Sequence, residues 1–419
     1  MKFIHAADLH IESPYKGIRS MNEELGGALL QKGFKAYTNL IDSCIAHQVD
    51  CLLIAGDSFD SDSGSLSAQY SFFRGLDRLN AHGIHVFIIC GNHDPLNQWA
   101  KNFTLPPNVT LFAANTVQHH LLTKNDKVVA AIYGVSYGER EENRRLVTQF
   151  SRIDEAPFAI GLLHGTFAGS THQNPYCPFN IDELRVTKMD YWALGHIHKH
   201  EVVNANNPLA VYAGNLQGRH FNETGEKGCV LVEVDGSTIL SHQFISLSEV
   251  VFDYIQRDIS DIHDLEGLFH LIDTIKSDLI STQKAYMLRV ELTGMSDLYQ
   301  VLNDQVELDL FVQKLNAENN YQQNFVCIDR IINHTIPLID LNQRKQSSDF
   351  VGDVIRRFDQ YEADNTLLMS LQHEVYDEIR SSKIGRYLKI GEDKDELKEI
   401  LNRAKWKCIA GMITNDEAS

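Results

Sequence analysis

Short apolar runs alternate with stretches of helical periodicity over roughly the first 245 residues of the chain. Residues 22–48 and 67–83 carry apolar side chains at helical spacing, and the second stretch ends at a glycine. The β-rich apolar runs predict strands within residues 1–7, 50–57, 84–94, 128–135, 158–165 and 190–198. The opening strand–helix–strand–helix–strand order predicts an α/β fold with a mainly parallel sheet and right-handed crossovers.

These apolar runs share a second property, because each is followed at once by polar residues. The first is followed by "DLH", the second by "GDSFD" and the third by "GNHD", and later runs end in "HG" and "GHIH". Ligand sites in open α/β sheets form outside the carboxyl ends of the strands. The pattern therefore places a candidate site where these strands end.

The pattern changes after about residue 248. Three further strands are expected within 248–258, 284–294 and 325–333, with helices at about 261–279 and 304–317 between them. Residues from about 350 to 404 have helical periodicity. We therefore expect a first domain at 1–248, a small α/β cap domain at 249–345 and a helical C-terminal region at 346–419.

The composition is that of an ordinary globular protein, with 419 residues of which 43% are hydrophobic. Its apolar runs are far shorter than the ~20 residues that a membrane helix needs, and no secretory signal is recognisable, so a cytoplasmic location without membrane association is expected. The seven cysteines form no CxxC pair. Those in strands, Cys51 and Cys90, are expected to be reduced, buried small hydrophobes.

The net charge of −18 argues against a protein that coats nucleic acid non-specifically, and the excess of acids is larger after residue 248. If the chain binds a polyanion, we expect a local site where bound cations or a partner supply the positive charge.

The polar residues at the strand ends form a set of oxygen and imidazole ligands without a thiolate. Such a mixed set suits Mn, Fe, Zn or Mg ions. Residues two apart in an extended segment point the same way, so each D-x-H or H-x-H pair can face one site. One such pair alone would more often be a turn or a cap, but the ordered set is specific. Its members are Asp8, His10, Asp57, Asn92, His164, His196 and His198.

Five strand ends that meet at one place fit a centre of two metal ions ~3.5–4 Å apart. We expect Asp57 to bridge the two ions. The first metal position is then completed by Asp8, His10 and His198, and the second by Asn92, His164 and His196. Glycines before Asp57, Asn92 and His196 would let the backbone approach the ions.

This centre would favour phosphate ester chemistry, because two carboxylates leave two divalent cations with net positive charge. A bridging water with a lowered pKa would attack phosphorus in line. His93 would protonate the leaving oxygen or stabilise its charge, and Asp94 would orient His93. The remaining histidines lack this context, although His5 is a candidate for a supporting contact.

The same motifs resemble those of the calcineurin-like metallophosphoesterase superfamily. Within it, "MKFIHAADLHIESP", "GDSFD", "GNHDP" and "ALGHIHKHEVV" look like the SbcD-type DNA double-strand-break repair exonucleases. The stretch "VYAGNLQGRHFNETGEKGCVLVEVDG" resembles in particular the YhaO-type bacterial branch. The likeness spans about residues 1–235.

The resemblance implies an αββα sandwich of two mixed sheets, two manganese ions and cleavage of DNA phosphodiester bonds. It carries the metal-ligand role onto the seven residues named above and the catalytic role onto His93. It also implies an SMC-like coiled-coil ATPase partner and a possible homodimer. The helices at 350–404 would then grip the partner, or they would pack against the cap domain.

Two places need a separate interpretation. Ser58 stands where the family more often has an apolar residue, and little effect is expected. Arg219 and His220, in "GRH", are candidates to contact a substrate phosphate, or they belong to a turn that braces the metal loop.

Alternative functions remain for such a centre. A protein phosphatase is disfavoured, because its GDxxDRG motif has an arginine that "GDSFDSDSG" lacks. A phosphodiesterase for nucleotides or other small diesters uses the same chemistry and is harder to exclude. A non-catalytic scaffold would have degenerate ligands, and this chain has none of those substitutions.

Overall fold

The computed structural model describes residues 1–60, 64–99, 104–153, 156–168, 176–381 and 394–412. The chain forms two compact units, each of which is described by itself. The first unit comprises residues 1–253, 278–288 and 319–327, and the second comprises 254–277, 289–318 and 328–419.

The first unit contains two six-stranded sheets. In the first sheet the strand order is β12-β11-β1-β2-β3-β4. The strands β1 to β4 are parallel, β11 is antiparallel to β1, and β12 is antiparallel to β11. Its strands are β1 (Lys2–Ala6), β2 (Cys51–Ala55), β3 (His85–Ile89), β4 (Val109–Leu111), β11 (Gly228–Asp235) and β12 (Thr238–Ser246).

The second sheet has the order β5-β6-β7-β8-β10-β9, with four central parallel strands and an antiparallel strand at each edge. Its strands are β5 (Gln118–Lys124), β6 (Lys127–Gly134), β7 (Ala159–His164), β8 (Tyr191–Gly195), β9 (Glu201–Asn204) and β10 (Leu209–Tyr212).

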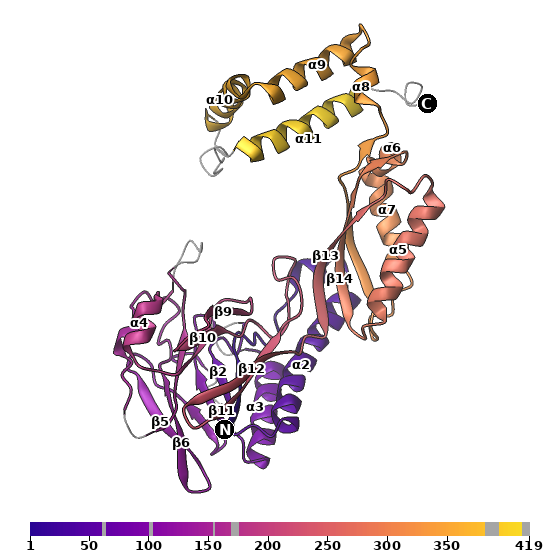
Figure 1. The fold of residues 1–419 in the computed structure, drawn as a ribbon. Coiled ribbons are helices and arrows are strands. Elements are labelled where there is room, and N and C mark those ends of the chain that lie inside the picture. Colours follow the sequence, from indigo (N-terminus) through magenta and orange to yellow (C-terminus); the bar gives the residue numbers. More distant parts are fainter. Residues whose placement is uncertain (61–63, 100–103, 154–155, 169–175, 382–393, 413–419) are drawn as a thin grey trace. The chain divides into compact units, whose positions relative to one another are not determined.

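The two sheets face each other, and helices cover their outer faces. Alternation along β2 shows this directly, because Leu53 packs between the sheets while Leu52 and Ile54 pack under the helices. Both faces of the central strands are buried, which explains their continuous apolar runs. Helices α2 (Glu23–Ala46) and α3 (Leu66–Ala81) lie side by side over the first sheet, while α4 (Ile181–Val186) packs on the second (Figure 1). The predicted αββα sandwich is confirmed.

A separate three-stranded sheet follows, in the order β13-β14-β16. Its strands are β13 (Val250–Asp258), β14 (Ala285–Thr293) and β16 (Val326–Asn333), with α5 (Leu265–Ile280) and α7 (Gln305–Asn316) between them in sequence. These are the three strands and two helices expected from the sequence. The compact units divide this sheet, so the domain boundaries at 248 and 345 stay predictions.

The second unit ends in helices α8 (Leu341–Arg344), α9 (Phe350–Ala363), α10 (Asn365–Ser381) and α11 (Lys394–Met412). Val351 and Ile355 of α9 pack with Ile409 of α11. The helical character expected for 350–404 is confirmed where the chain is described, and residues 382–393 of that stretch lie outside the described part. Among the helices in the described ranges, none combines the length and the apolar character needed to span a bilayer.

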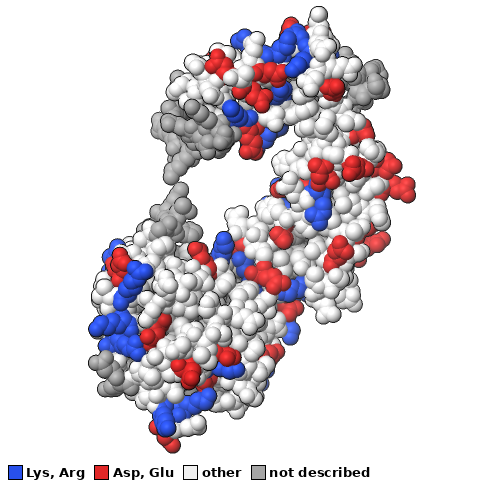
Figure 2. All heavy atoms as spheres, viewed as in Figure 1, with Lys and Arg blue, Asp and Glu red and all other residues white. Residues whose placement is uncertain are grey.

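Charged side chains of both signs lie on the surface, and most cysteines lie in the interior. On the face drawn in Figure 2, Lys and Arg side chains stand in separate groups beside Asp and Glu side chains. The cysteines are free, and Cys51 and Cys90 are fully buried, as expected, whereas Cys408 is exposed.

Candidate metal centre

The loops that leave β1 and β2 run side by side and carry three of the expected ligands. The Asp8 amide donates to the Gly56 carbonyl at 3.0 Å, and the His10 amide donates to the Asp57 carbonyl at 3.1 Å. Asp8, His10 and Asp57 have φ angles of 49°, 41° and 52°. Left-handed backbone at non-glycine residues is strained and is concentrated at functional sites.

The side chains expected at the first metal position lie together. Donor atoms of Asp8, His10 and His198 all lie within 4.8 Å of one another. His10 Nε2 is 3.2 Å from His198 Nε2, which in turn is 3.7 Å from Asp8 Oδ1. Residues separated by nearly 190 positions therefore meet because β1 and β8 end at the same edge of the sandwich.

The side chains expected at the second position also converge. His164 Nε2 is 3.0 Å from Asn92 Oδ1, and this oxygen is 3.2 Å from His196 Nδ1. Asp57 Oδ2 lies between the two groups, 3.5 Å from His164 Nε2 and 3.8 Å from His10 Nε2. This is the place expected of a carboxylate that bridges two ions.

The hydrogen-bond chemistry of this cluster fits cations. The ring of His164 points Nδ1 at the Ala55 carbonyl, 2.9 Å away, so we assign the proton there and a lone pair to Nε2. That lone pair faces the Asn92 and Asp57 oxygens, which are also acceptors. Asp8 and Asp57 are at most 1% exposed. When His164 is neutral, these buried acceptors face one another without a proton between them, and this arrangement suits a positively charged ion.

Asp57 and His164 each shift the pKa of the other. Burial would raise the pKa of Asp57, but the nearby rings of His164, His10 and His93 hold it well below its usual range. Burial would lower the pKa of His164, yet the charge and hydrogen bond of Asp57 raise it to about 9. In a chain without bound ions, a proton on His164 therefore balances the Asp57 carboxylate.

Two glycines let the strand ends come this close. A methyl group at Gly91 would overlap the Asp57 carboxylate, and one at Gly195 would overlap the Ala55 carbonyl. The predicted close approach of the backbone at these glycines has this physical basis.

His93, the expected catalytic residue, is held from two sides. Its amide donates to Asp57 Oδ1 at 2.9 Å, and its Nδ1 lies 3.1 Å from the Asp60 carbonyl. Its ring meets the His10 ring edge-on, with 4.9 Å between centroids. The contact with Asp60 leaves Nε2 as the nitrogen available to a substrate.

Asp94 has different partners from those expected. Its Oδ2 accepts from the Ser58 amide at 2.7 Å, and its Oδ1 accepts from the Gly91 amide at 2.9 Å. Burial, reinforced by the Asp57 charge, raises its pKa to about 7. Asp94 therefore ties the loop after β2 to the loop after β3, while the contact at His93 Nδ1 comes from Asp60.

The structure also separates the two interpretations of "GRH". Arg219 Nη1 donates to Asp60 Oδ1 at 2.9 Å, and its Nη2 donates to Glu223 Oε1 at 3.0 Å. The guanidinium is thus committed to two acids, which favours the bracing turn over a phosphate contact. His220 is more exposed, with Nδ1 accepting from the Asn222 amide at 3.2 Å.

Two residues of the site were missed by sequence reasoning. Asp60 has a visible signal, because it is the second acid of "GDSFD". Glu223, whose Oε1 lies 2.7 Å from His198 Nδ1, has none. His5, the candidate supporting residue, instead contacts the Tyr191 hydroxyl at 3.0 Å, and burial lowers its pKa to about 3.

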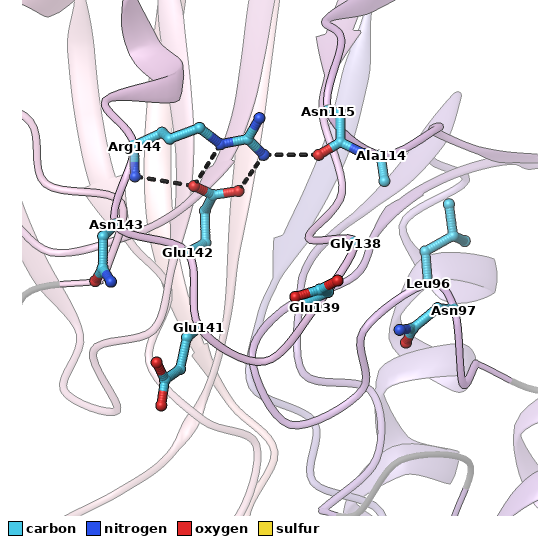
Figure 3. A pocket seen from close by; sticks show the side chains of 10 residues that line it. All are labelled: Leu96, Asn97, Ala114, Asn115, Gly138, Glu139, Glu141, Glu142, Asn143 and Arg144. Atoms are coloured by element: carbon cyan, nitrogen blue, oxygen red, sulfur yellow. Dashed lines mark hydrogen bonds and ion pairs between the residues drawn. The ribbon is translucent and has the colours of Figure 1, made fainter.

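A cavity of about 590 Å³ opens beside the segment that follows His93 (Figure 3). Its wall includes Glu139, Glu141 and Glu142, while the guanidinium of Arg144 is bonded to Glu142 and to Asn115. A second cavity, of about 360 Å³, is lined by Arg19 together with Glu12 and Asp60. In both walls the acids outnumber the bases.

The sequence is similar to those of known proteins. The model of the calcineurin-like phosphoesterase family matches residues 1–200. The "Uncharacterized metallophosphoesterase YhaO" of Bacillus subtilis is 34% identical over 376 residues, which cover 90% of this chain and 91% of that protein.

Two more distant relatives are named as a DNA repair protein and as a nuclease subunit. The DNA double-strand break repair protein Mre11 of Methanocaldococcus jannaschii is 23% identical over 66% of this chain and 74% of its own length. One subunit of the nuclease SbcCD from Bacillus subtilis is 22% identical over 59% of this chain and 70% of its own length. The extended match to YhaO and the family model lead to one conclusion: the chain belongs to the calcineurin-like metallophosphoesterase family.

Proposed function

We propose that this chain is a two-metal, manganese-dependent phosphodiesterase that acts on DNA, as an exo- or endonuclease in double-strand-break repair. The observation that carries the proposal is the convergence of buried carboxylate and imidazole donors around Asp57, with His93 beside them. The names of the Mre11 and SbcCD relatives support DNA as the substrate.

In this proposal one ion would be held by Asp8, His10 and His198, and the other by Asn92, His164 and His196. Asp57 would contribute a ligand to both. Bound divalent ions would lower the pKa of a water molecule and neutralise phosphate charge. The chain itself supplies the proton for the leaving oxygen. Protonated His93 donates through Nδ1 to the Asp60 carbonyl, which leaves Nε2–H to donate to that oxygen.

The test is degradation of end-labelled linear duplex and of circular single-stranded DNA in Mn²⁺, Mg²⁺ or EDTA. Wild type is expected to cut in Mn²⁺, while Asn92→Ala and His93→Ala lose cutting. His47→Ala is the matched control, because this histidine is exposed at the end of α2 and is not among the candidate site residues. Cutting in EDTA, or full cutting by His93→Ala, would contradict the proposal.

The alternative is a phosphodiesterase for nucleotides or other small diesters. The acidic walls of the two cavities and the net charge of −18 favour it, because both repel a long polyanion. The test compares bis-p-nitrophenyl phosphate with DNA as substrate, for the chain alone and together with the partner protein proposed below. Hydrolysis of the small diester without any cutting of DNA in either case would select this alternative.

We further propose an SMC-like coiled-coil ATPase as partner, with the chain as a possible homodimer. The support is the name of one relative, the SbcCD subunit, which identifies that protein as part of a complex. The match to it covers 59% of this chain. The helices α9 to α11 are the proposed contact. The test is whether the chain co-purifies with such an ATPase. Loss of co-purification when α9 to α11 are deleted would support the proposal, whereas unchanged co-purification would show that these helices are not the contact.

A further inference from the structure

Next to the first metal position, three charged side chains contact one another in a row. We call them the clamp: Glu223, Arg219 and Asp60. Arg219 is its centre, with Nη2 at 3.0 Å from Glu223 Oε1 and Nη1 at 2.9 Å from Asp60 Oδ1. Glu223 and Arg219 belong to the loop between β10 and β11, while Asp60 follows β2. The side chains are only 6%, 16% and 24% exposed, so solvent screens these contacts weakly.

Each acid of the clamp reaches the outward nitrogen of a histidine. Glu223 Oε1 is 2.7 Å from His198 Nδ1. Asp60 Oδ1 is 3.2 Å from His10 Nδ1, within ion-pair range but outside the alignment of a hydrogen bond. The Asp60 carbonyl is 3.1 Å from His93 Nδ1. One clamp therefore contacts two proposed ligands and the proposed proton donor.

Two neighbours compete at His198 Nδ1, because Arg219 Nη2 also lies 2.9 Å away. A proton on Nδ1 favours the carboxylate, and a lone pair on Nδ1 favours the guanidinium. The carboxylate contact is the shorter, and the guanidinium already donates to the carboxylates of Glu223 and Asp60. With the proton on Nδ1, Nε2 keeps its lone pair toward Asp8 and His10, as a metal ligand requires.

The carboxylate of Glu223 is itself fixed in place. Its Oε2 accepts from Asn215 Nδ2 at 3.0 Å and from the Arg219 amide at 2.9 Å. Lys227, later in the same loop, donates from Nζ to the His198 carbonyl at 3.1 Å. The loop therefore holds both the ring and the backbone of His198, and a fixed partner selects one tautomer better than a mobile one.

We propose that the clamp selects the metal-binding tautomer of His198 and holds Asp60 against His10 and His93, so that it links occupancy of the first metal position to the placement of His93. Glu223, Arg219 and Asp60 are then positioning residues. The inference rests on the metal centre of the proposed function, and it assigns Arg219 to ligand orientation in place of phosphate binding. Supporting partners of metal-bound histidines typically change metal affinity about 10- to 100-fold.

The direct test is to measure manganese binding by Glu223→Gln. Calorimetry gives the affinities, and electron paramagnetic resonance shows whether the bound ions are paired or isolated. Wild type is expected to bind two Mn²⁺ and give the spectrum of a spin-coupled pair. Glu223→Gln keeps the shape of the side chain but no longer favours one tautomer. We expect one of the two binding steps to weaken about 10- to 100-fold, and a six-line spectrum of isolated Mn²⁺ to appear.

Glu226→Gln is the matched control, because Glu226 lies in the same loop but pairs with Lys284 at its half-exposed side chain. It is expected to bind Mn²⁺ as wild type does. Arg219→Lys tests the link to His93, because lysine keeps the charge but cannot bridge both acids. At saturating Mn²⁺, this variant is expected to have a lower kcat and a shifted pH profile, with KM for a small diester unchanged.

Thermal unfolding of each variant in the presence of a chelator measures the stability of the metal-free protein. It shows whether a substitution acts on folding or only on the position of the ligands. A Glu223→Gln variant with wild-type binding of both ions would overturn the inference and leave the metal centre standing. Equal weakening of both binding steps with a large fall in Tm would also overturn it, because that pattern indicates only a structural role. Wild type that binds no Mn²⁺ would overturn the metal centre, and the inference with it.

Discussion

At the scale of single residues, the proposed function assigns metal binding and proton donation to different side chains. His93 touches Asp57 through its backbone amide, so its ring can be changed without removing that contact. His93→Asn is expected to lower kcat for a small diester about 10²- to 10⁴-fold, the usual worth of a general acid. Calorimetry should show unchanged Mn²⁺ binding. Wild-type kcat in His93→Asn would remove His93 from the mechanism.

A second prediction at this scale concerns protons. Asp57 raises the pKa of His164 to about 9, so in the chelated protein His164 is protonated below that pH and neutral above it. A metal ligand must be neutral, so binding of Mn²⁺ at pH 7.5 is expected to release about one proton, and the affinity should rise with pH. Calorimetry in two buffers of different ionisation enthalpy measures this release. Heats that do not depend on the buffer would contradict it.

That the candidate ligands lie together could be predicted from sequence, because they follow apolar strands closely and the strand ends of such a fold share an edge. Supporting contacts could not be found in this way. Glu223 meets His198 because of the path of one loop, and nothing in the composition of that loop marks the residue. Asp94 was expected at His93 because the two are adjacent, but neighbours along a turn point in different directions.

At the scale of elements, the site depends on how closely the strand ends approach. Gly91→Ala is expected to push the Asp57 carboxylate aside and to weaken Mn²⁺ binding at least tenfold, about 1.4 kcal/mol or more. Gly33→Ala is the control, because Gly33 lies within α2 with open space at its Cβ.

The control should behave differently, with unchanged Mn²⁺ binding and a gain of about 0.5–1 kcal/mol in the free energy of unfolding. Calorimetry and urea unfolding measure the two quantities. Wild-type binding in Gly91→Ala would show that the close approach at Gly91 is not required.

Most elements of the first unit were predictable because their strands are buried on both faces. Strand β5 was not, because it lies at a sheet edge and six of its seven residues are exposed. Such a strand has no apolar run and no clean alternation, and only its pairing with β6 defines it. The C-terminal periodicity predicted helices correctly, but it does not say what they contact.

At the scale of the whole molecule, the net charge of −18 constrains how DNA is bound. Acids outnumber bases in both cavities near the site, so few phosphates are expected to be neutralised by the chain itself. For His93→Asn in Mn²⁺, log K for duplex DNA should fall with log salt at a slope of only about −1 to −3. Fluorescence anisotropy measures this slope. A much steeper slope would mean that a basic surface of the chain takes part in binding, contrary to this prediction.

In the proposed function, five strand ends build one centre for two ions around Asp57. Equilibrium dialysis against Mn²⁺, followed by metal analysis, tests it most directly in wild type and in Asp57→Asn, which removes the bridging charge. We predict about two Mn²⁺ per wild-type chain and fewer than one in Asp57→Asn, with both proteins folded by circular dichroism. Two Mn²⁺ retained by Asp57→Asn, or none bound by wild type, would contradict it.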